Sequence, residues 1–180
     1  GTRKVAPETR DRVLAAISST DYHQHGPARA LRRSRTDTIA LVISEAGYPV
    51  LDRMALGVEQ QARRSGMTVF LAHSGDDPEQ ELAAVLALRD RRVDGILLAP
   101  VVNSLPEIPQ LLAASEVPLV LLDRPSPSEI DQVSVSNSEP TGELVEHVVR
   151  AGHRRIAFVA QGSFVSTFDE RLTGYEGAMA

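Results

Sequence analysis

Side chains that could bind a small polar molecule follow four short apolar runs, at residues 39–43, 69–72, 96–99 and 119–122. In chain order, the residues after these runs are Tyr48 and Leu51, His73 and Ser74, Pro100, and Asp123. Their aromatic faces can stack on a ligand, and their polar groups can form hydrogen bonds with it. Parallel sheets of alternating strands and helices bind ligands beyond the carboxyl ends of their strands. If the runs are such strands, these residues gather at one ligand-binding edge.

The runs lack the alternation of polar and apolar residues that marks a half-exposed strand, which is typical of strands buried on both faces. A fifth run follows at 133–135, and helix-period segments lie between most of the runs, at 50–64, 78–91 and 104–115. This alternation predicts an α/β, flavodoxin-like parallel sheet with helices on both faces. Residues 93–100 are expected to form its middle strand.

Two of the predicted helices have sequence signals at their starts. Asp77 has the features of an N-cap, with Pro78 at the first helical position, and Ser104 begins a similar pattern before Glu107. Helical spacing predicts inward-facing residues in the first two helices: Leu51, Met54, Ala55, Val58 and Ala62, then Leu82, Val85, Leu86 and Leu88. Further along, the pattern predicts a helix at 140–151, a sixth strand at 156–160 and a helix over 170–180.

The composition is that of a folded globular protein, with 180 residues, 42% of them hydrophobic and 24% charged. The absence of cysteine excludes disulfides and thiolate metal sites. No apolar run approaches the roughly 20 residues that a membrane-spanning helix needs, and the start of the chain has no signal-peptide pattern. We therefore expect a cytoplasmic protein without a membrane partner.

The first 36 residues are basic, although the whole chain has a formal net charge of −5. They contain eight basic residues against three acidic ones. This segment includes a predicted helix at 7–17, with Val13, Leu14 and Ile17 on one face, and a short basic stretch at 26–33. A basic head of this kind fits nucleic-acid binding, and it equally fits a solvated tail.

No combination of residues predicts a catalytic centre. No glycine-rich phosphate motif follows a strand, and the middle strand ends in Ala99-Pro100 rather than in the acceptor aspartate of a receiver domain. The five histidines lack the spacing of metal ligands on one element. We therefore expect no enzymatic activity, no metal and no cofactor.

Four short motifs occur in this order along the chain: Val93-Asp94-Gly95-Ile96-Leu97, Val120-Leu121-Leu122-Asp123-Arg124-Pro125, Gly152-His153-Arg154-Arg155-Ile156-Ala157-Phe158 and Arg171-Leu172-Thr173-Gly174-Tyr175. With their spacing, they resemble the LacI/GalR family of bacterial transcriptional repressors. Residues 5–13 resemble the last helix of that family's helix-turn-helix headpiece, and residues 28–32 resemble its hinge helix. Each motif alone is a weak sign of the family, but together the motifs are specific to it, and the resemblance covers essentially the whole chain.

The resemblance implies a DNA-binding headpiece, a hinge helix and a two-lobed, periplasmic-binding-protein-like sensor with a small effector between its lobes. We expect the chain to be a piece of such a protein, with the second lobe incomplete. Residues 1–25 would be the end of the headpiece, 26–37 the hinge and linker, 38–135 the N-terminal lobe, and 136–180 the beginning of the C-terminal lobe. The implied partners are operator DNA, the effector and a second copy in a homodimer formed largely through the helices of the first lobe, such as the one at 50–64.

In this family the hinge leucine wedges into the DNA minor groove, and Leu31 occupies that place. The resemblance therefore implies DNA contacts by the hinge residues Ala28, Arg29, Leu31 and Arg32. Leu31 could instead pack on the sensor lobe. Pro27 departs from the aliphatic residue that many relatives carry there, and it requires the hinge helix to begin at or just before it.

The resemblance also places the effector among Tyr48, Leu51, His73, Ser74, Pro100 and Asp123 on one side, with Arg171 and the loop 163–169 on the other. Asp123 and Arg171 match positions that contact effectors in relatives, and such groups suit a polyhydroxylated ligand such as a sugar. Asp123 could instead serve the turn before Pro125, and Arg171 a surface ion pair. Ser136-Asn137 departs from the Asp-Asn that is common in the family. The alternative is a transporter's solute-binding protein with the same sensor fold, but the basic head, the hinge and the missing export signal favour the regulator.

Overall fold

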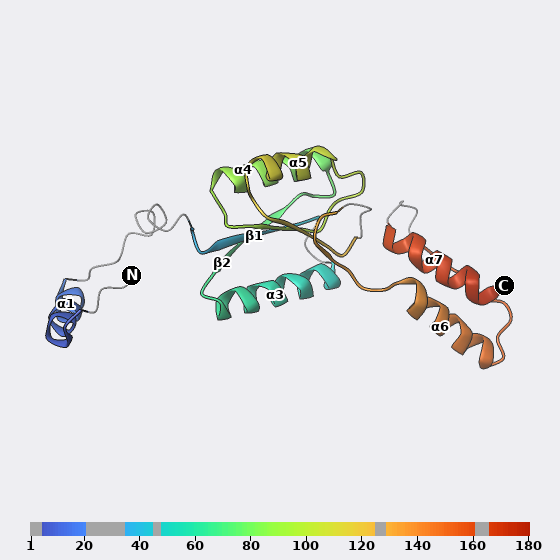
Figure 1. Ribbon diagram of the computed structural model, residues 1–180. Helices are drawn as coiled ribbons and strands as arrows, with labels where there is room; N and C mark the ends of the chain where they lie inside the picture. Colours follow the sequence, from blue (N-terminus) through green and yellow to red (C-terminus); the bar gives the residue numbers. More distant parts are fainter. Residues whose placement is uncertain (1–4, 21–34, 45–47, 125–128, 161–165) are drawn as a thin grey trace. The chain divides into compact units, whose positions relative to one another are not determined.

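The computed structural model describes residues 5–20, 35–44, 48–124, 129–160 and 166–180. The chain divides into two compact units, residues 1–36 and 37–180, which are described separately. In the first unit, helix α1 (Pro7–Ser19) begins with Pro7 and confirms the helix predicted there (Figure 1). All its residues are exposed, including Val13, Leu14 and Ile17. The hinge residues Ala28, Arg29, Leu31 and Arg32 lie outside the described residues.

The second unit is built on a parallel sheet of five strands, which confirms the predicted fold class. The strands are β1 (Thr38–Ile43), β2 (Thr68–His73), β3 (Ile96–Leu98), β4 (Leu119–Leu122) and β5 (Gln132–Val133). Their order is β2-β1-β3-β4-β5, with every neighbouring pair parallel. The strand predicted to be central, β3, does lie in the middle. Strand β5 ends at Val133, two residues earlier than expected.

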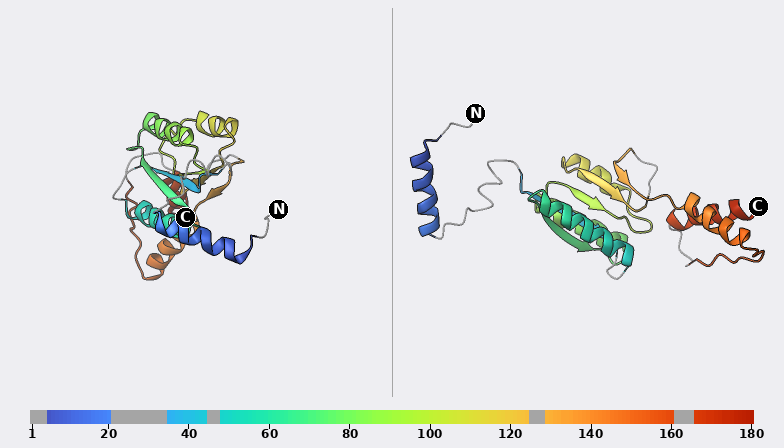
Figure 2. Two further views of the ribbon diagram at one scale, coloured as in Figure 1. Left: turned by 90° about the vertical axis from the view of Figure 1, so that its left-hand side faces the viewer. Right: turned by 90° about the horizontal axis from the view of Figure 1, so that it is seen from below.

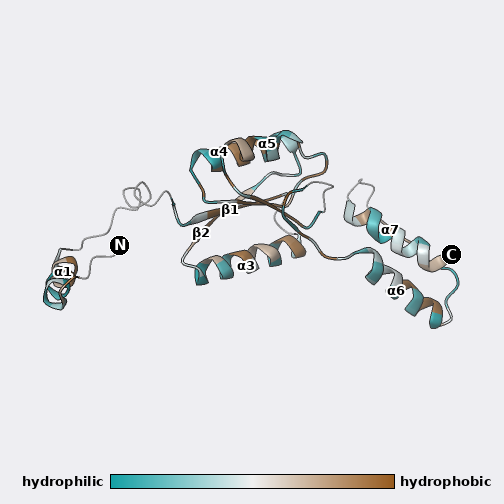
Figure 3. Ribbon diagram, in the orientation of Figure 1, coloured by the Kyte–Doolittle hydropathy of each residue, from teal (hydrophilic) through white to brown (hydrophobic). Residues whose placement is uncertain are grey.

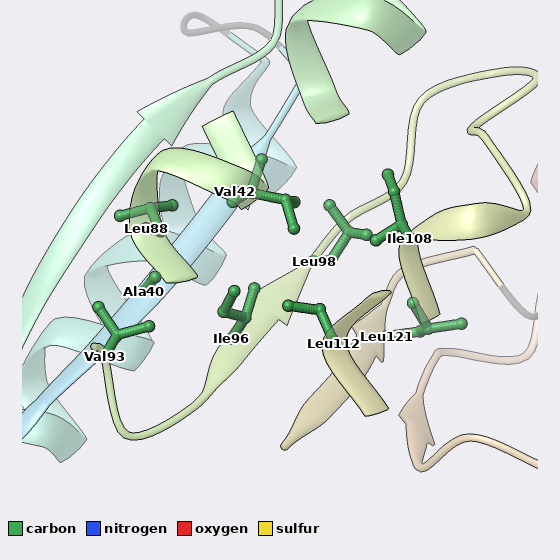
Figure 4. Close-up of a cluster of buried hydrophobic side chains, with 10 residues drawn as sticks. Ala40, Val42, Leu88, Val93, Ile96, Leu98, Ile108, Leu112 and Leu121 are labelled. Carbon is green, nitrogen blue, oxygen red and sulfur yellow. The ribbon is translucent and has the colours of Figure 1, made fainter. Parts of the chain in front are cut away.

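Helices cover both faces of the sheet. Helix α3 (Pro49–Arg64) lies on one face, and α4 (Pro78–Asp90) and α5 (Glu107–Ala114) lie on the other (Figures 1 and 2). Successive residues of a strand point to opposite faces, so β3 contributes to two cores. Ile96 and Leu98 pack with residues of α4 and α5, as Figure 4 shows, while Leu97 packs on the α3 side. This double burial explains the unbroken apolar run.

Helix α3 shows how the apolar pattern directs packing. Its apolar and polar residues alternate along the ribbon in Figure 3. Leu51, Ala55 and Ala62 are buried, and Met54 and Val58 pack against the same core, as the helical spacing predicted. Burial of one leucine-sized side chain contributes about 2 kcal/mol to folding, so this stripe holds the helix on the sheet.

Helix α4 begins as predicted, because the Asp77 carboxylate accepts hydrogen bonds from the backbone amides of Glu79 and Gln80 at 2.8 and 3.4 Å. A hydrogen bond from the Gln80 side chain, with these two backbone bonds after it, lowers the pKa of Asp77. Helix α5 differs from expectation, because it begins at Glu107 after Pro106 and no side chain caps it. Ser104 donates its hydroxyl to Glu81 instead.

The last part of the chain contains two helices, α6 (Ser138–Arg150) and α7 (Ser166–Met179), which pack together. Gly174 permits this contact, because a Cβ there would overlap the backbone carbonyl of Ser138. Helix α7 begins at Ser166, four residues before the predicted start. No helix among the described residues has the length and apolar character to cross a membrane.

The sixth strand predicted at 156–160 was wrong, since these residues have no regular secondary structure. A strand needs a hydrogen-bonded neighbour, and the sheet formed by the described residues contains only β1 to β5. The Ile156 carbonyl accepts a hydrogen bond from the Tyr175 hydroxyl at 2.8 Å, and Val159 is 92% exposed. An apolar run alone does not show whether a neighbouring strand lies beside it.

Candidate ligand-binding cavity

A cavity of about 370 Å³ lies beyond the carboxyl ends of the central strands. This volume falls within the range of small-molecule sites. Its wall includes four of the predicted ligand residues, Tyr48, Leu51, Asp123 and Arg171. The other wall residues are Ser44, Val50, Asp76, Val102, Arg124, Thr167 and Phe168.

One side of the cavity, here called the strand-end wall, comprises its residues between 44 and 124. Ser44 directly follows β1 and is buried, and Tyr48 precedes the first residue of α3 with its side chain 47% exposed. Leu51 is buried in the core between α3 and the sheet. The strand-end wall therefore combines the half-exposed ring of Tyr48 with two buried residues, Ser44 and Leu51.

A tight turn presents Asp123 and Arg124 in this wall. The Arg124 amide donates to the Leu122 carbonyl at 2.8 Å, a three-residue γ-turn, and Asp123 at its centre has a φ of 68°. The Asp123 amide donates to the Val133 carbonyl at 3.0 Å, so β5 holds the turn in place. A positive φ at a residue other than glycine stores strain, and such residues cluster at ligand-binding sites. The turn directs two adjacent side chains of opposite charge into the cavity wall.

Arg124 is itself fixed from a second direction. Its Nη1 donates to the Pro100 carbonyl at 2.7 Å, which joins the end of β4 to the end of β3. Thus Pro100 contributes a backbone acceptor that positions Arg124, and it is not a wall residue. The sequence predicted that Pro100 lines the effector site, whereas in the structure its carbonyl binds Arg124 beside the cavity.

The opposite side, here called the α7 wall, consists of Thr167, Phe168 and Arg171. All three lie in the first two turns of α7. The guanidinium carbon of Arg171 lies 5.6 Å from the centre of the Phe168 ring, within the range of a cation–π contact. Residues three apart on a helix are neighbours, so α7 places an aromatic face beside a cation.

The wall combines opposite charges with aromatic faces. Asp76 and Asp123 contribute carboxylates, Arg124 and Arg171 contribute guanidinium groups, and their formal charges cancel. Tyr48 and Phe168 add aromatic rings. Ring faces stack on the apolar faces of a ligand, while ionised groups form strong hydrogen bonds to hydroxyls. The arrangement is suited to a neutral molecule with many hydroxyl groups.

Two further predicted residues do not line this cavity. Ser74 is fully buried, and its hydroxyl donates to the Ile43 carbonyl at 3.3 Å, so it joins the ends of β1 and β2. His73 ends β2, an outer strand of the sheet, and is exposed outside the wall. Position after a strand therefore does not suffice, because the neighbouring strand ends decide which side chains reach the cavity.

Several wall residues were not named individually from the sequence, although two of them lie in a loop that was predicted to face the ligand. Arg124 directly follows Asp123 in the family-like motif at 120–125, and this motif was the available signal. Thr167 and Phe168 fall in the predicted loop 163–169, but the structure places them in the first turn of α7. Asp76 follows β2 and has a φ of 58°, a turn conformation that the sequence did not reveal. No three His, Asp or Glu side chains gather as a metal site within the parts of the chain that the structure describes.

A fully buried carboxylate lies close behind the strand-end wall. Glu81 of α4 accepts hydrogen bonds from the Val101 amide, at 2.7 Å, and from the Ser104 hydroxyl. Burial raises the pKa of this carboxyl group, while the two hydrogen bonds and the charge of Arg124 act in the opposite direction. The apolar pattern gave no sign that a glutamate would occupy this place.

Comparison with known proteins gives a consistent result. Residues 36–180 match the family described as periplasmic binding proteins and sugar binding domain of LacI family. The maltose regulon regulatory protein MalI of Escherichia coli (strain K12) is 29% identical over 176 residues, which cover 97% of this chain and 52% of MalI. The chain spans about half the length of the curated relatives it matches.

Two solved structures extend this similarity. The crystal structure of a protein assigned as a ribose operon repressor from Burkholderia thailandensis has a TM-score of 0.76 at 30% identity, covering 81% of this chain and 55% of that one. The structure of the transcriptional regulator CelR in complex with cellobiose has a TM-score of 0.66 at 29% identity, covering 99% of this chain and 54% of CelR.

Proposed function

The chain belongs to the family of periplasmic binding proteins and LacI-type sugar-binding domains, and from this premise we propose that it is part of a DNA-binding transcriptional regulator that responds to a sugar-like effector. The observation that carries this proposal is the cavity, because its wall combines rings, carboxylates and guanidinium groups from two separate parts of the chain. CelR, whose structure matches 99% of this chain, is a regulator seen with cellobiose.

In the proposed complex, each wall has a distinct task. Tyr48 and Phe168 stack on the carbon faces of the sugar, while Asp123 and Arg171 bind its hydroxyls. A ligand that touches both walls favours the arrangement in which they are close. Binding therefore shifts the conformational equilibrium of the lobe that carries α7 toward this arrangement, and this shift is the proposed effector response. The proposed effector is neutral, since the formal charges of the wall cancel.

The DNA-binding role is assigned to the basic head. The chain divides into compact units after Thr36, which supports a boundary between the head and the sensor. We assign residues 1–25 to the end of a headpiece, 26–37 to the hinge and linker, 38–135 to the first sensor lobe and 136–180 to the second. Ala28, Arg29, Leu31 and Arg32 are proposed hinge contacts to operator DNA. Such a regulator acts as a homodimer in the bacterial cytoplasm.

The dimer contact is proposed on the outer surface of α3 and the edge strand β2. Val50 and Leu56 on α3 are 65% and 54% exposed, and Phe70 and Leu71 on β2 are also exposed. A second copy would bury these apolar side chains, and burial of apolar surface drives most association. Val50 also lines the cavity, so dimer formation and ligand binding would share one end of α3.

The alternative is a transporter's solute-binding protein, which would use the same cavity. The relatives favour the regulator, because MalI and CelR match 97% and 99% of the chain and both carry regulatory names. A similarity confined to residues 37–180 would not have separated the two functions.

The test measures DNA binding by the full-length protein on an operator selected from a random-sequence pool. Adding cellobiose, maltose or D-ribose is expected to change the apparent affinity for this DNA. The Arg171→Ala variant is expected to keep its DNA affinity and lose the response to the sugar, since the α7 wall loses its cation. The matched control, Arg150→Ala, removes an exposed arginine of α6 outside the cavity and outside the proposed dimer surface, and should respond normally. Failure to select any DNA sequence would overturn the proposal that the protein is a DNA-binding regulator.

A further inference from the structure

Glu81 differs from the other acidic residues of helix α4 in being completely buried. Glu79, two residues earlier, is exposed, whereas the relative exposure of Glu81 is 0%. A charged side chain without partners is costly to bury, so its surroundings must compensate. Its position in the first turns of α4 is favourable, because the amino end of a helix attracts negative charge.

Both oxygens of the Glu81 carboxylate are used by the loop that follows β3. Oε2 accepts the Val101 amide at 2.7 Å, and Oε1 accepts the Ser104 hydroxyl. These donors flank Val102, which lines the cavity. One carboxylate therefore holds both sides of the residue that the loop contributes to the strand-end wall.

The second connection runs through Arg124. Its charge acts on Glu81, and its Nη1 donates to the carbonyl of Pro100, the residue directly before Val101. Arg124 itself lines the cavity. The ends of β3, β4 and α4 are thus joined by one polar network whose only buried acid is Glu81.

We propose that Glu81 is a positioning residue, which fixes Val102 and Arg124 in the wall of the ligand cavity without touching the ligand. This inference rests on the proposed function, because the wall must bind an effector for its position to matter. The ionised carboxylate fits the site best, since the Val101 amide can only donate and Arg124 is cationic. Replacement by glutamine keeps the shape and removes the charge.

The test uses nuclear magnetic resonance of the 180-residue chain without any ligand. In Glu81→Gln, the amide signals of Val101 and Val102 and the side-chain NH signal of Arg124 are expected to shift together. Glu79→Gln is the matched control, since it makes the same exchange at an exposed position on the same helix, and should leave these signals in place. Unchanged Val102 and Arg124 signals in Glu81→Gln would overturn the proposal.

A pH titration separates positioning from simple packing. The Val101 amide signal should titrate with a midpoint above the usual glutamate value of about 4.3, because burial raises the pKa of Glu81. Arg124→Gln should move this midpoint higher, since the cation that favours the ionised carboxylate is gone. Glu81→Gln should abolish the titration. A titration midpoint that is the same in Arg124→Gln and the wild type would contradict the proposed link between Glu81 and Arg124.

If Glu81→Gln does not fold, Ser104→Ala replaces it, because this variant removes one hydrogen-bond donor and keeps the charge. It should shift Val102 in the same way, and an unshifted signal would overturn the proposal. For a sugar that the wild type binds, among cellobiose, maltose and D-ribose, Glu81→Gln should weaken binding about tenfold while Glu79→Gln does not; equal affinities would overturn the link to binding. If the wild type binds none of them, the effector proposal fails, and the magnetic resonance result alone decides the positioning role.

Discussion

The two walls of the cavity are built by different means. The strand-end wall rests on a fully buried core, and a γ-turn, the Arg124–Pro100 hydrogen bond and Glu81 fix its residues. The α7 wall rests on the contact of α7 with α6, and Arg171 on it is exposed. One wall is held by the sheet, and the other is held by a helix pair. The difference suggests a division of labour, in which a rigid wall recognises the ligand and a separately supported wall responds to it.

A buried strand residue should support the strand-end wall most strongly. Leu98 of β3 is almost fully buried, so Leu98→Ala is expected to destabilise the sheet by about 3 kcal/mol through lost burial and a cavity. Thermal unfolding should show the loss. Leu144→Ala on α6 makes the same exchange at an exposed position and should change stability by less than about 0.5 kcal/mol. Equal effects of the two variants would mean that the sheet is not the rigid support.

The support of the α7 wall should be most sensitive to substitution of Gly174, where α7 contacts α6. Gly174→Ala places a methyl group against the Ser138 carbonyl, so we expect about 2 kcal/mol of destabilisation as α6 and α7 separate. The control is Gly177→Ala in the same helix, where nothing lies within 4 Å and alanine should stabilise the helix by about 0.5 kcal/mol. Hydrogen exchange should show the Gly174→Ala effect in α6 and α7 and not in β1 or β3. Uniform loss of protection would argue against separate supports.

Asp123 allows shape and chemistry to be separated in the strand-end wall. Glycine accepts a φ of 68° without strain, so Asp123→Gly is expected to raise stability by up to about 1 kcal/mol. The same variant removes the carboxylate and should weaken sugar binding. Unfolding curves and binding isotherms measured on the same variant check both effects. Lower stability with normal binding would mean that Asp123 serves the turn alone.

Much of the sheet could be predicted because its inner strands β1, β3 and β4 are largely buried and give unbroken apolar runs. The outer strands β2 and β5 also read as apolar runs, but their residues are mostly exposed in the structure, so the expected burial on both faces was wrong for them. The helix starting at Pro78 could be placed because capping chemistry is local in the sequence. The strand expected at 156–160 failed because pairing depends on a distant partner, which periodicity does not report. Glu81 was missed for a related reason, since its partners Val101 and Ser104 are about twenty residues away and no pattern links them to it.

The predicted site was correct in its general location and uneven in its residues. Tyr48, Leu51, Asp123 and Arg171 line the cavity, whereas His73, Ser74 and Pro100 do not. All of these residues except Arg171 lie at or after the end of a strand or in the first turn of a helix, so the rule of strand ends finds the region on the side of the sheet. Arg171 lies in the second turn of α7 and came only from the family resemblance. It cannot tell a side chain that enters the cavity from one whose hydrogen bonds tie two strand ends together, as Ser74 shows. Whether the four wall residues bind an effector stays a prediction.

The central claim is that the two walls bind one sugar-like molecule together. Isothermal titration of the full-length protein with cellobiose, maltose and D-ribose tests it most directly, with Arg171→Ala, Asp123→Asn and Arg150→Ala measured beside the wild type. We predict that at least one sugar binds and that each of the two wall variants weakens binding at least tenfold, while Arg150→Ala binds like the wild type. Full affinity in either wall variant, or no binding of any sugar by the wild type, would contradict the account.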